Sequence, residues 1–258
     1  MKLSALMYHA IGMPQGDDGA DAHYSISAEA FNEHLTRLNG RGLGLCAVRD
    51  VLDGSRTDKR AVAITFDDGH ISNYDAAFPA LLAAGATADF FVNPSNVGRA
   101  HFVTWSALRE MDQAGMSIQS HGYTHRYFED LNVEEAREEL TRSKAMIEDK
   151  LGRPVTLLAP PGGRINATVH RLAREAGYQN VCVSRPGQWR PGIRTVPRFA
   201  VLASTTPETI EGWAEGRPAM LARQVTGYWA RYAIKKALGN ALYDRVRERI
   251  LSSQEREA

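Results

Sequence analysis

Short apolar segments alternate with amphipathic, helix-like segments along most of this chain, and that alternation is the strongest constraint on its fold. Strands separated by helices cannot form tight hairpins, so they pair in parallel through crossover connections, as in an α/β fold. The expected strands are Leu3–His9, Gly44–Val48, Val62–Phe66, Asp89–Val92, Ser117–Ser120, Val155–Leu158 and Asn180–Val183. The expected helices are Ala28–Gly40, Tyr74–Ala84, Ser106–Ala114, Val133–Leu151 and Ala167–Ala176. A chain of 258 residues is long enough for one barrel-type domain.

The composition is that of an ordinary globular protein, with 43% hydrophobic and 24% charged residues. The net charge of +1 gives no global attraction to nucleic acid, so no nucleic-acid partner is expected. Cys46 and Cys182 form no CxxC pair, which indicates two reduced, buried thiols rather than disulfides or a thiolate metal site. The apolar stretch at Met1–His9 is too short for a signal peptide, and no run approaches the roughly 20 residues of a membrane span. A cytoplasmic location is therefore expected.

Two neighbouring carboxylates, Asp67 and Asp68, end an apolar run in the segment Thr65-Phe66-Asp67-Asp68-Gly69. Asp-Asp-Gly by itself is good turn chemistry, so a simple turn is the alternative interpretation. Two histidines, His121 and His125, follow about fifty residues later at a spacing of four. One carboxylate and two histidines suit a catalytic Zn²⁺, which takes three protein ligands and leaves a position for water. The second carboxylate is then free to act as a base on that water.

The candidate polar residues come directly after expected strands. They are His9, Asp67, Asp68, His121 and the loop Pro160-Pro161-Gly162-Gly163. In a closed parallel barrel, catalytic residues sit at the carboxyl ends of the strands. Such a fold would bring these distant segments together around one mouth.

Thr-Phe-Asp-Asp-Gly followed by Ser-His-Gly-Tyr-Thr-His resembles the polysaccharide deacetylase family, also called the NodB-homology or carbohydrate esterase 4 family. The resemblance covers roughly residues 3–200. It implies a distorted (β/α) barrel, here residues 1–216, that removes N- or O-linked acetyl groups from sugars. It further implies Asp67 as catalytic base and Asp68, His121 and His125 as ligands of a divalent metal, Zn²⁺ first, with Co²⁺, Ni²⁺ or Fe²⁺ as alternatives.

The third motif of the family usually reads Arg-Pro-Pro-Tyr-Gly, whereas this chain has Ala159-Pro160-Pro161-Gly162-Gly163. The backbone N–H of Gly162, beside Pro161, could still donate to the oxyanion. The missing arginine normally steadies the base. Arg164 and Arg198 are the candidate substitutes, although a solvent-facing arginine is the simpler interpretation of each.

The later motifs of the family also depart from its pattern. Trp189, in Ser184-Arg185-Pro186-Gly187-Gln188-Trp189, could line a sugar-binding wall or lie in the core, and both interpretations stay open. The late histidine that serves as general acid is absent. His9, in Tyr8-His9, is the candidate replacement, since a similar early histidine occurs in the poly-N-acetylglucosamine deacetylase subgroup.

Residues 217–258 are expected to form a basic C-terminal helical extension, since residues 217–251 contain eight arginines and lysines against two acids. Within residues 219–252, Tyr228, Trp229 and Tyr232 lie among these cations. The segment could pack on the barrel, or lie as an amphipathic helix on an anionic membrane surface. The second arrangement would suit a lipid-linked glycan substrate and a peripheral membrane location.

Three functions are compatible with these features. The first is a metal-dependent deacetylase acting on an N-acetylated glycan or its precursor. The second is a metal-dependent hydrolase of another C–N bond, of deformylase or imidase type. The third is a glycan-binding protein that has lost activity, which the absent arginine and late histidine would favour.

Overall fold

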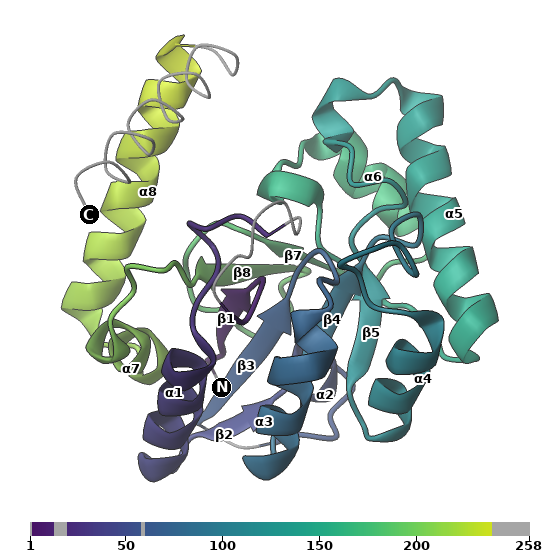
Figure 1. Cartoon of the computed structure of the whole chain (residues 1–258). Coiled ribbons are helices and arrows are strands. Elements are labelled where there is room, and N and C mark those ends of the chain that lie inside the picture. The colour runs from purple at the N-terminus through teal and green to yellow at the C-terminus, as the bar shows by residue number, and fades with distance from the viewer. Residues whose placement is uncertain (1, 13–19, 58–59, 239–258) are drawn as a thin grey trace.

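The computed structural model describes residues 2–12, 20–57 and 60–238, and eight strands in this part of the chain form one parallel sheet (Figure 1). They are β1 (Ser4–Tyr8), β2 (Gly44–Cys46), β3 (Ala61–Phe66), β4 (Asp89–Val92), β5 (Ser117–Ser120), β6 (Leu157–Leu158), β7 (Asn180–Val183) and β8 (Thr195–Ala200). Because β1 pairs with both β3 and β8, all strands except β2 close into a ring. The expected (β/α) barrel is confirmed.

Strand β3 pairs with three strands, and this departs from a regular barrel, in which each strand has two neighbours. One edge of β3 pairs with β1, from Ser4 opposite Val62 to Tyr8 opposite Phe66. β2 pairs with the first three residues of β3 and β4 with the last two, so these two strands divide its other edge. The carboxyl end of β3 is therefore held on both sides, which fixes the backbone that enters the Asp-Asp turn.

Side chains alternate along each strand and separate two hydrophobic cores. The barrel interior contains small or flat side chains, and the short helix α2 (Val48–Leu52) packs into the same cluster. Ala5, Ala63, Phe91, Cys182 and Val196 belong to this interior cluster. The interior is thus a packed core that ends in polar residues at the carboxyl end of β3.

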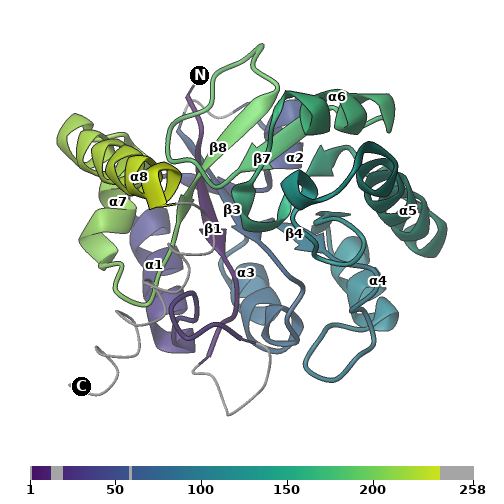
Figure 2. The same cartoon turned by 90° about the horizontal axis from the view of Figure 1, so that it is seen from above.

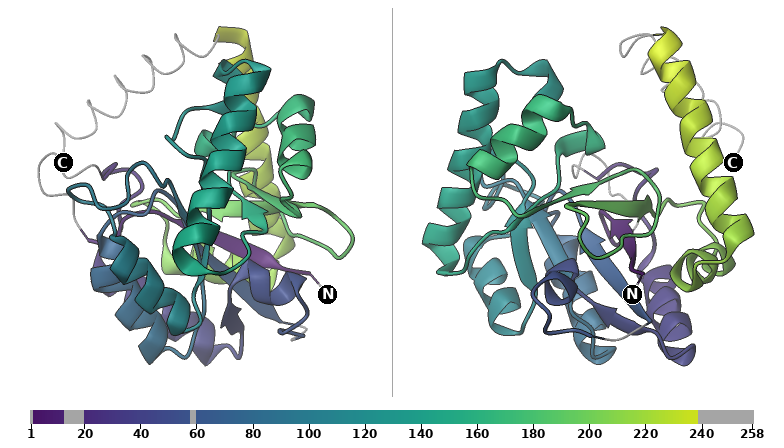
Figure 3. Two further views of the ribbon diagram at one scale, coloured as in Figure 1. Left: turned by 90° about the vertical axis from the view of Figure 1, so that its right-hand side faces the viewer. Right: turned by 180° about the vertical axis from the view of Figure 1, so that it is seen from behind.

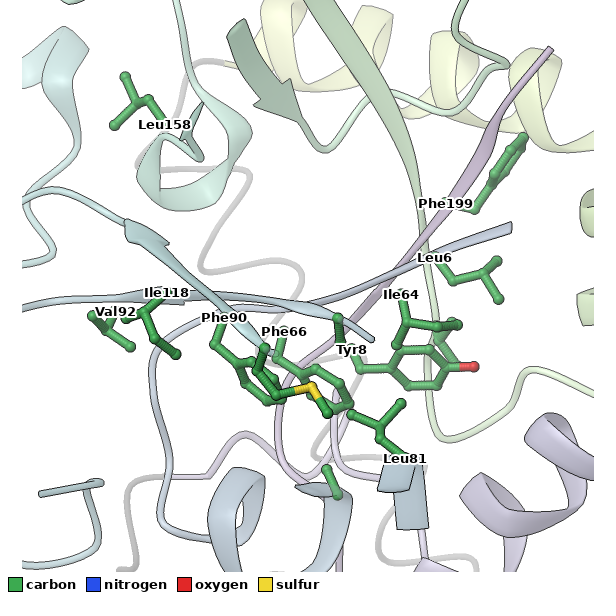
Figure 4. Close-up of a cluster of buried hydrophobic side chains, with 14 of the residues drawn as sticks. Leu6, Tyr8, Ile64, Phe66, Leu81, Phe90, Val92, Ile118, Leu158 and Phe199 are labelled. Carbon is green, nitrogen blue, oxygen red and sulfur yellow. The ribbon is translucent and has the colours of Figure 1, made fainter. Parts of the chain in front are cut away.

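The larger core lies between the barrel and its helices (Figure 4). Leu6, Ile64, Phe66 and Phe90 face this layer, and the rings of Phe66 and Phe90 stack with centroids 4.8 Å apart. Burying large side chains on the outer face stabilises the ring by about 1.5–3 kcal/mol per side chain. The chemistry can then be confined to the inner face and its rim.

Helices surround the ring, as the view along the barrel shows (Figure 2). They are α1 (Ala28–Gly40), η1 (Asn73–Ala77), α3 (Phe78–Ala83), α4 (Trp105–Gln113), η2 (Phe128–Asp130), α5 (Val133–Leu151), η3 (Pro161–Gly163), α6 (Ala167–Glu175), α7 (Pro207–Glu215) and α8 (Pro218–Leu238). Local capping sets several starts: Ser27 accepts from Ala30 N–H at α1, and Asn132 forms a capping box with Glu135 at α5.

The C-terminal helix α8 is attached to the barrel through α7. Met220 packs against Gly212, where even a methyl group would collide with the methionine sulfur. From there α8 runs past the strands, and Trp229 and Tyr232 are exposed (Figure 3). Residues 239–258, the rest of the expected extension, lie outside the described residues. No helix among the described residues is long and apolar enough to cross a membrane.

The structure differs from the sequence-based expectation in four places. Strand β8 and helices α2 and α7 were not predicted, and the expected helix at 74–84 begins with the π-helical turn η1. The sequence of β8, Thr-Val-Pro-Arg-Phe-Ala, contains a proline and a charge, both unusual within a buried strand. Pro197 is the last residue of β8 in register with β7, opposite Val183, and Arg198 has a buried partner described below.

Candidate active site

Strand β3 ends in two neighbouring aspartates with different surroundings. Ala61, Ala63 and Thr65 face the barrel interior, and the same alternation turns Asp67 inward, where it is 3% exposed. Asp68 has a φ of 73° and its side chain is 37% exposed. The chain turns sharply here, so two adjacent carboxylates serve different partners.

Gly69 makes this turn possible. It has a φ of 71°, and a Cβ at this position would lie 3.1 Å from Val92. Only glycine combines a positive φ with this close approach without strain. The Asp-Asp-Gly segment therefore forms a turn, which was the alternative interpretation of its sequence. The same turn directs Asp68 towards His121 and His125.

The buried Asp67 pairs with Arg198 of β8. Nη1 and Nη2 of Arg198 donate to Oδ1 and Oδ2 of Asp67 at 2.6 and 2.8 Å, and Nη1 also reaches Thr65 Oγ1 at 3.2 Å. Burial raises the pKa of Asp67, but the Arg198 charge outweighs it, and the net pKa is lower than usual. Arg198 is 0% exposed, so the expectation of a solvent-facing arginine was wrong. The Arg198 guanidinium is buried against Asp67.

His121 and His125 follow β5, two strands from β3 in the sheet, and face Asp68. Their Nε2 atoms lie 3.2 and 3.1 Å from Asp68 Oδ1. His121 is buried, and its Nδ1 lies 2.7 Å from the carbonyl oxygen of Ala159, which follows β6. Three strand ends therefore meet at this point, as the expected barrel mouth required.

The donor set fits a divalent cation. One ligand atom each of Asp68, His121 and His125 lie within 4.8 Å of one another. A carbonyl oxygen can only accept, so the His121 proton resides on Nδ1 and its Nε2 lone pair faces Asp68. Asp68 Oδ1 has no well-formed hydrogen bond to any described residue. Lone pairs that converge in this way are stabilised by a cation between them.

His9, directly after β1, is enclosed at the same mouth. Its ring lies 4.5 Å from that of Tyr24, and its Nδ1 is buried without a hydrogen-bond partner among the described residues. Burial lowers the pKa of His9, and the charges of Asp68 and Asp67 offset this only in part. The structure thus brings His9 into electrostatic contact with both aspartates.

The loop after β6 lies beside the histidine segment. Pro161 is buried, and its Cγ would lie 3.8 Å from a Cβ at Gly122, next to His121. Gly162 has a φ of 63° and is exposed, and its N–H makes no backbone hydrogen bond in the described part of the chain. A Cβ at Gly162 would lie 2.8 Å from the Tyr127 ring, so the tyrosine of the usual motif would not fit here unchanged.

Comparison with known proteins agrees with this geometry. A sequence model of the polysaccharide deacetylase family matches residues 54–181. The peptidoglycan-N-acetylglucosamine deacetylase of Bacillus cereus is 32% identical over 149 residues, which cover 56% of this chain and 68% of that protein. The chain belongs to the polysaccharide deacetylase family.

Solved structures of the family share the fold. The deacetylase PplD of Streptococcus pyogenes, solved with acetate, superimposes with a TM-score of 0.74 at 27% identity, over 81% of this chain and 96% of that one. A polysaccharide deacetylase of Bacillus cereus has a TM-score of 0.75 at 25% identity, over 83% of this chain and 69% of that one. The chain is thus a member of a family of carbohydrate deacetylases, which are hydrolases and generally metal-dependent.

The arginine that pairs with Asp67 comes from β8. Ala159 stands where the family resemblance implied an arginine, and Arg198, two strands further along the ring, forms the bidentate contact with Asp67. Arg164, the other candidate, stacks on the Tyr127 ring at 3.9 Å. The arginine–aspartate pair is present, supplied by β8.

Trp189 does not lie at the mouth. It is 6% exposed, its backbone pairs with Leu3 at the start of β1, and its Nε1 donates to the carbonyl oxygen of Ile193 at 2.6 Å. It packs in the interior cluster near the opposite end of the barrel. Of the two interpretations, the structure supports the core tryptophan and contradicts the sugar-binding wall.

Sequence reasoning missed the residues that hold the histidine segment. Glu139 of α5 accepts hydrogen bonds from the N–H groups of Tyr123 and Thr124, at 2.8 and 2.9 Å, and from the Thr124 hydroxyl. Asn93, after β4, donates to the carbonyl oxygen of His121 at 2.6 Å. Glu139 could have been found, because it interrupts the buried stripe of α5 that otherwise contains Ala136, Leu140, Ser143 and Ile147.

The segment that carries His9 is held in a similar way. Nδ2 of Asn73, the first residue of η1, donates to the carbonyl oxygen of His9 at 2.7 Å. Ser72 Oγ accepts from the N–H of Ile11 at 2.9 Å and pairs with His70 Nδ1 at 2.8 Å. The turn after β3 is therefore tied directly to the loop after β1. π-helical turns such as η1 are frequent at functional sites.

Proposed function

We propose that this protein is a metal-dependent deacetylase that removes N-acetyl groups from a glycan containing N-acetylglucosamine. The observation that carries the proposal is the convergence at one barrel mouth of a buried, arginine-paired carboxylate and an Asp-His-His donor set. The peptidoglycan substrate named for the Bacillus cereus relative supports the choice of sugar. The chain spans about two thirds of that relative's length, so its polymer partner is part of the proposal.

Asp68, His121 and His125 would hold the metal, with Zn²⁺ the first candidate, since two imidazoles and one carboxylate suit it. When bound, the metal would polarise the acetyl carbonyl and lower the pKa of a bound water. Asp67 would accept the proton of the attacking water. Arg198 keeps Asp67 ionised and fixes the direction of its lone pairs.

The remaining steps fall to groups on the other side of the mouth. The Gly162 N–H, next to Pro161, would donate to the oxyanion as the tetrahedral centre forms. His9 would deliver a proton to the leaving amine, and the charges of Asp68 and Asp67, which favour its protonated form against the effect of burial, support this role. Together these roles give the amide hydrolysis a base, an oxyanion donor and an acid.

Residues 1–216 are proposed as the catalytic domain and 217–258 as an extension. Helix α8 supports this division because its most extensive contact is with α7 and because Trp229 and Tyr232 are exposed. Contact of residues 219–252 with an anionic membrane, a lipid-linked substrate and a cytoplasmic location with peripheral membrane contact remain predictions.

The test is acetate release from N-acetylglucosamine oligomers and peptidoglycan fragments, before and after chelator treatment and after metal is restored. We expect activity that disappears with chelator and returns with Zn²⁺ or Co²⁺. Formate measured in the same samples separates deacetylation from deformylation, and O-acetylated xylan separates N- from O-deacetylation. A metal-loaded protein that releases acetate from none of these would overturn the proposal and favour the binding protein.

Two variants separate the roles of the candidate base and acid. Asp67→Asn should lower the rate by about 10²–10⁴-fold while metal content stays unchanged, because the base lies outside the donor set. His9→Ala should lower the rate by about 10²-fold or more, again with metal retained. Full turnover in either variant would remove that residue from its proposed role.

A further inference from the structure

The connection between β7 and β8 leaves part of the outer barrel face without a helix. Residues 184–194 link these neighbouring strands without a helix, whereas α6 precedes β7 and α7 follows β8 (Figure 3). A cavity of about 350 Å³ opens beside α6 at this place. Among its lining residues are His170, Arg171, Arg174, Tyr178, Gln179 and Arg194.

The cavity is cationic, and its lining contains no carboxylate from the residues that the structure describes. Arg171 is paired with Glu175 at 2.6 Å, and the same carboxylate also holds Arg137 at 2.9 Å. Arg174 and Arg194 form no side-chain hydrogen bond or ion pair with any residue in the described part of the chain. In a chain whose net charge is only +1, two uncompensated guanidinium groups in one hollow are a local excess.

The rest of the cavity suits a small anion. Tyr178 is buried, and its hydroxyl donates to the carbonyl oxygen of Leu140 at 2.9 Å. The hydroxyl is thus already engaged, and the ring lines the cavity as an apolar surface. His170 is partly buried at the wall, where burial and then the charge of Arg185 lower its pKa. The cavity therefore combines a positive charge, an apolar surface formed by the Tyr178 ring and the guanidinium donors of Arg174 and Arg194.

We propose that this cavity binds a phosphate-bearing small molecule through Arg174 and Arg194. Guanidinium groups donate in planar pairs that match the oxygens of a phosphate group. The concave shape and small volume favour a single phosphate or diphosphate group over the flat surface of a membrane. The site shares no residue with the barrel mouth, so it does not depend on the proposed deacetylase function.

The test uses inorganic pyrophosphate, titrated calorimetrically into the full-length protein with chloride as the background anion. Arg174→Gln and Arg194→Gln should each weaken binding about tenfold or more, because each removes charge-assisted hydrogen bonds. Arg109→Gln is the matched control, since Arg109 is an exposed arginine of α4 outside the cavity, and it should bind like the unaltered chain. Circular dichroism and acetate release should be unchanged in all three variants.

A second readout locates the ligand. The ring signals of His170 should shift on addition of pyrophosphate, and this shift should vanish in Arg174→Gln. Binding to phosphatidylglycerol vesicles is measured in parallel, to test a membrane surface as the alternative source of phosphate groups. Absence of pyrophosphate binding, equal binding by all variants, or binding to vesicles alone would each overturn the proposal.

Discussion

Asp67 and Asp89 are both buried aspartates of the barrel, one at its mouth and one at the first residue of β4, yet their pKa values move in opposite directions. The pKa of Asp67 is held below its usual range against the effect of burial, because Arg198 pairs with it. Burial raises the pKa of Asp89 to about 7, although it accepts the N–H of Val48 at 2.5 Å. A cation in direct contact keeps Asp67 charged, whereas the hydrogen bonds of Asp89 with Ser117 and Val48 and the charge of Arg49 do not offset the effect of burial on its pKa.

The contrast shows how one barrel can hold both a candidate base and a structural acid, with Asp89 in register with Thr65, two residues before Asp67. Asp89 joins β4 to the start of α2 and so helps to close the barrel. As the proposed base, Asp67 would have to stay ionised, and its partner Arg198 reaches it from a strand far along the chain. The same residue type serves packing or chemistry according to its partner.

The largest effect is expected from Arg198→Met, which gives Asp67 a burial like that of Asp89 without a cation. We expect the free energy of unfolding to fall by about 3–5 kcal/mol, because a buried charge loses its partner. Denaturant unfolding measures this, and acetate release should fall about hundredfold as Asp67 loses its orientation. Arg194→Met removes an exposed arginine and should change neither quantity.

If Arg198→Met does not fold, Arg198→Lys tests the same contact. The lysine keeps a charge but cannot donate in a bidentate manner, so part of the stability should return while activity stays low. Unfolding and acetate release of Arg198→Met equal to those of the unaltered chain would contradict the assigned contact.

Asp89→Asn tests the other side of the comparison through pH. The folded pKa of about 7 lies above the usual value near 3.8, so between these values the folded state holds a proton that the unfolded state releases. This contribution is fully present below about pH 4 and is lost as pH rises towards 7, by at most about 4 kcal/mol.

Unfolding free energies of the two chains at pH 5 and pH 8 measure this difference. The variant, which does not titrate, should gain stability relative to the unaltered chain between these values. Asp75→Asn, at an exposed position of η1, is the control and should follow the unaltered chain. A parallel pH profile for Asp89→Asn would mean that Asp89 is charged in the fold.

The smallest effect concerns how the mouth holds its histidines. Glu139→Ala removes the acceptor of three hydrogen bonds from the segment between His121 and His125. Metal affinity, measured by competition with a chromogenic chelator, should fall about 10–100-fold, as for other residues that orient metal ligands. Glu138→Ala, at an exposed position on the same helix, should leave it unchanged. Equal affinities in the two variants would remove Glu139 from this role.

The sequence was sufficient for the parts of the site that follow strands directly. Asp68, His121 and His125 each end or follow a strand, and a parallel barrel brings such positions together. Arg198 was a candidate, but its environment could not be predicted. It lies inside β8, where a proline and a charge hide the strand pattern, and only the ring closure reveals its partner. The sequence did not decide between the two interpretations of Trp189, because a tryptophan suits either end of a barrel.

The contact between Asp67 and Arg198 spans 131 residues and depends on the last strand of the ring. During synthesis on the ribosome, the Asp-Asp turn and both histidines emerge well before β8 does. The nascent chain therefore contains the proposed metal ligands before the partner of the proposed base has been made. Under the proposed function, hydrolysis would begin only after β8 inserts beside β1 and completes the barrel.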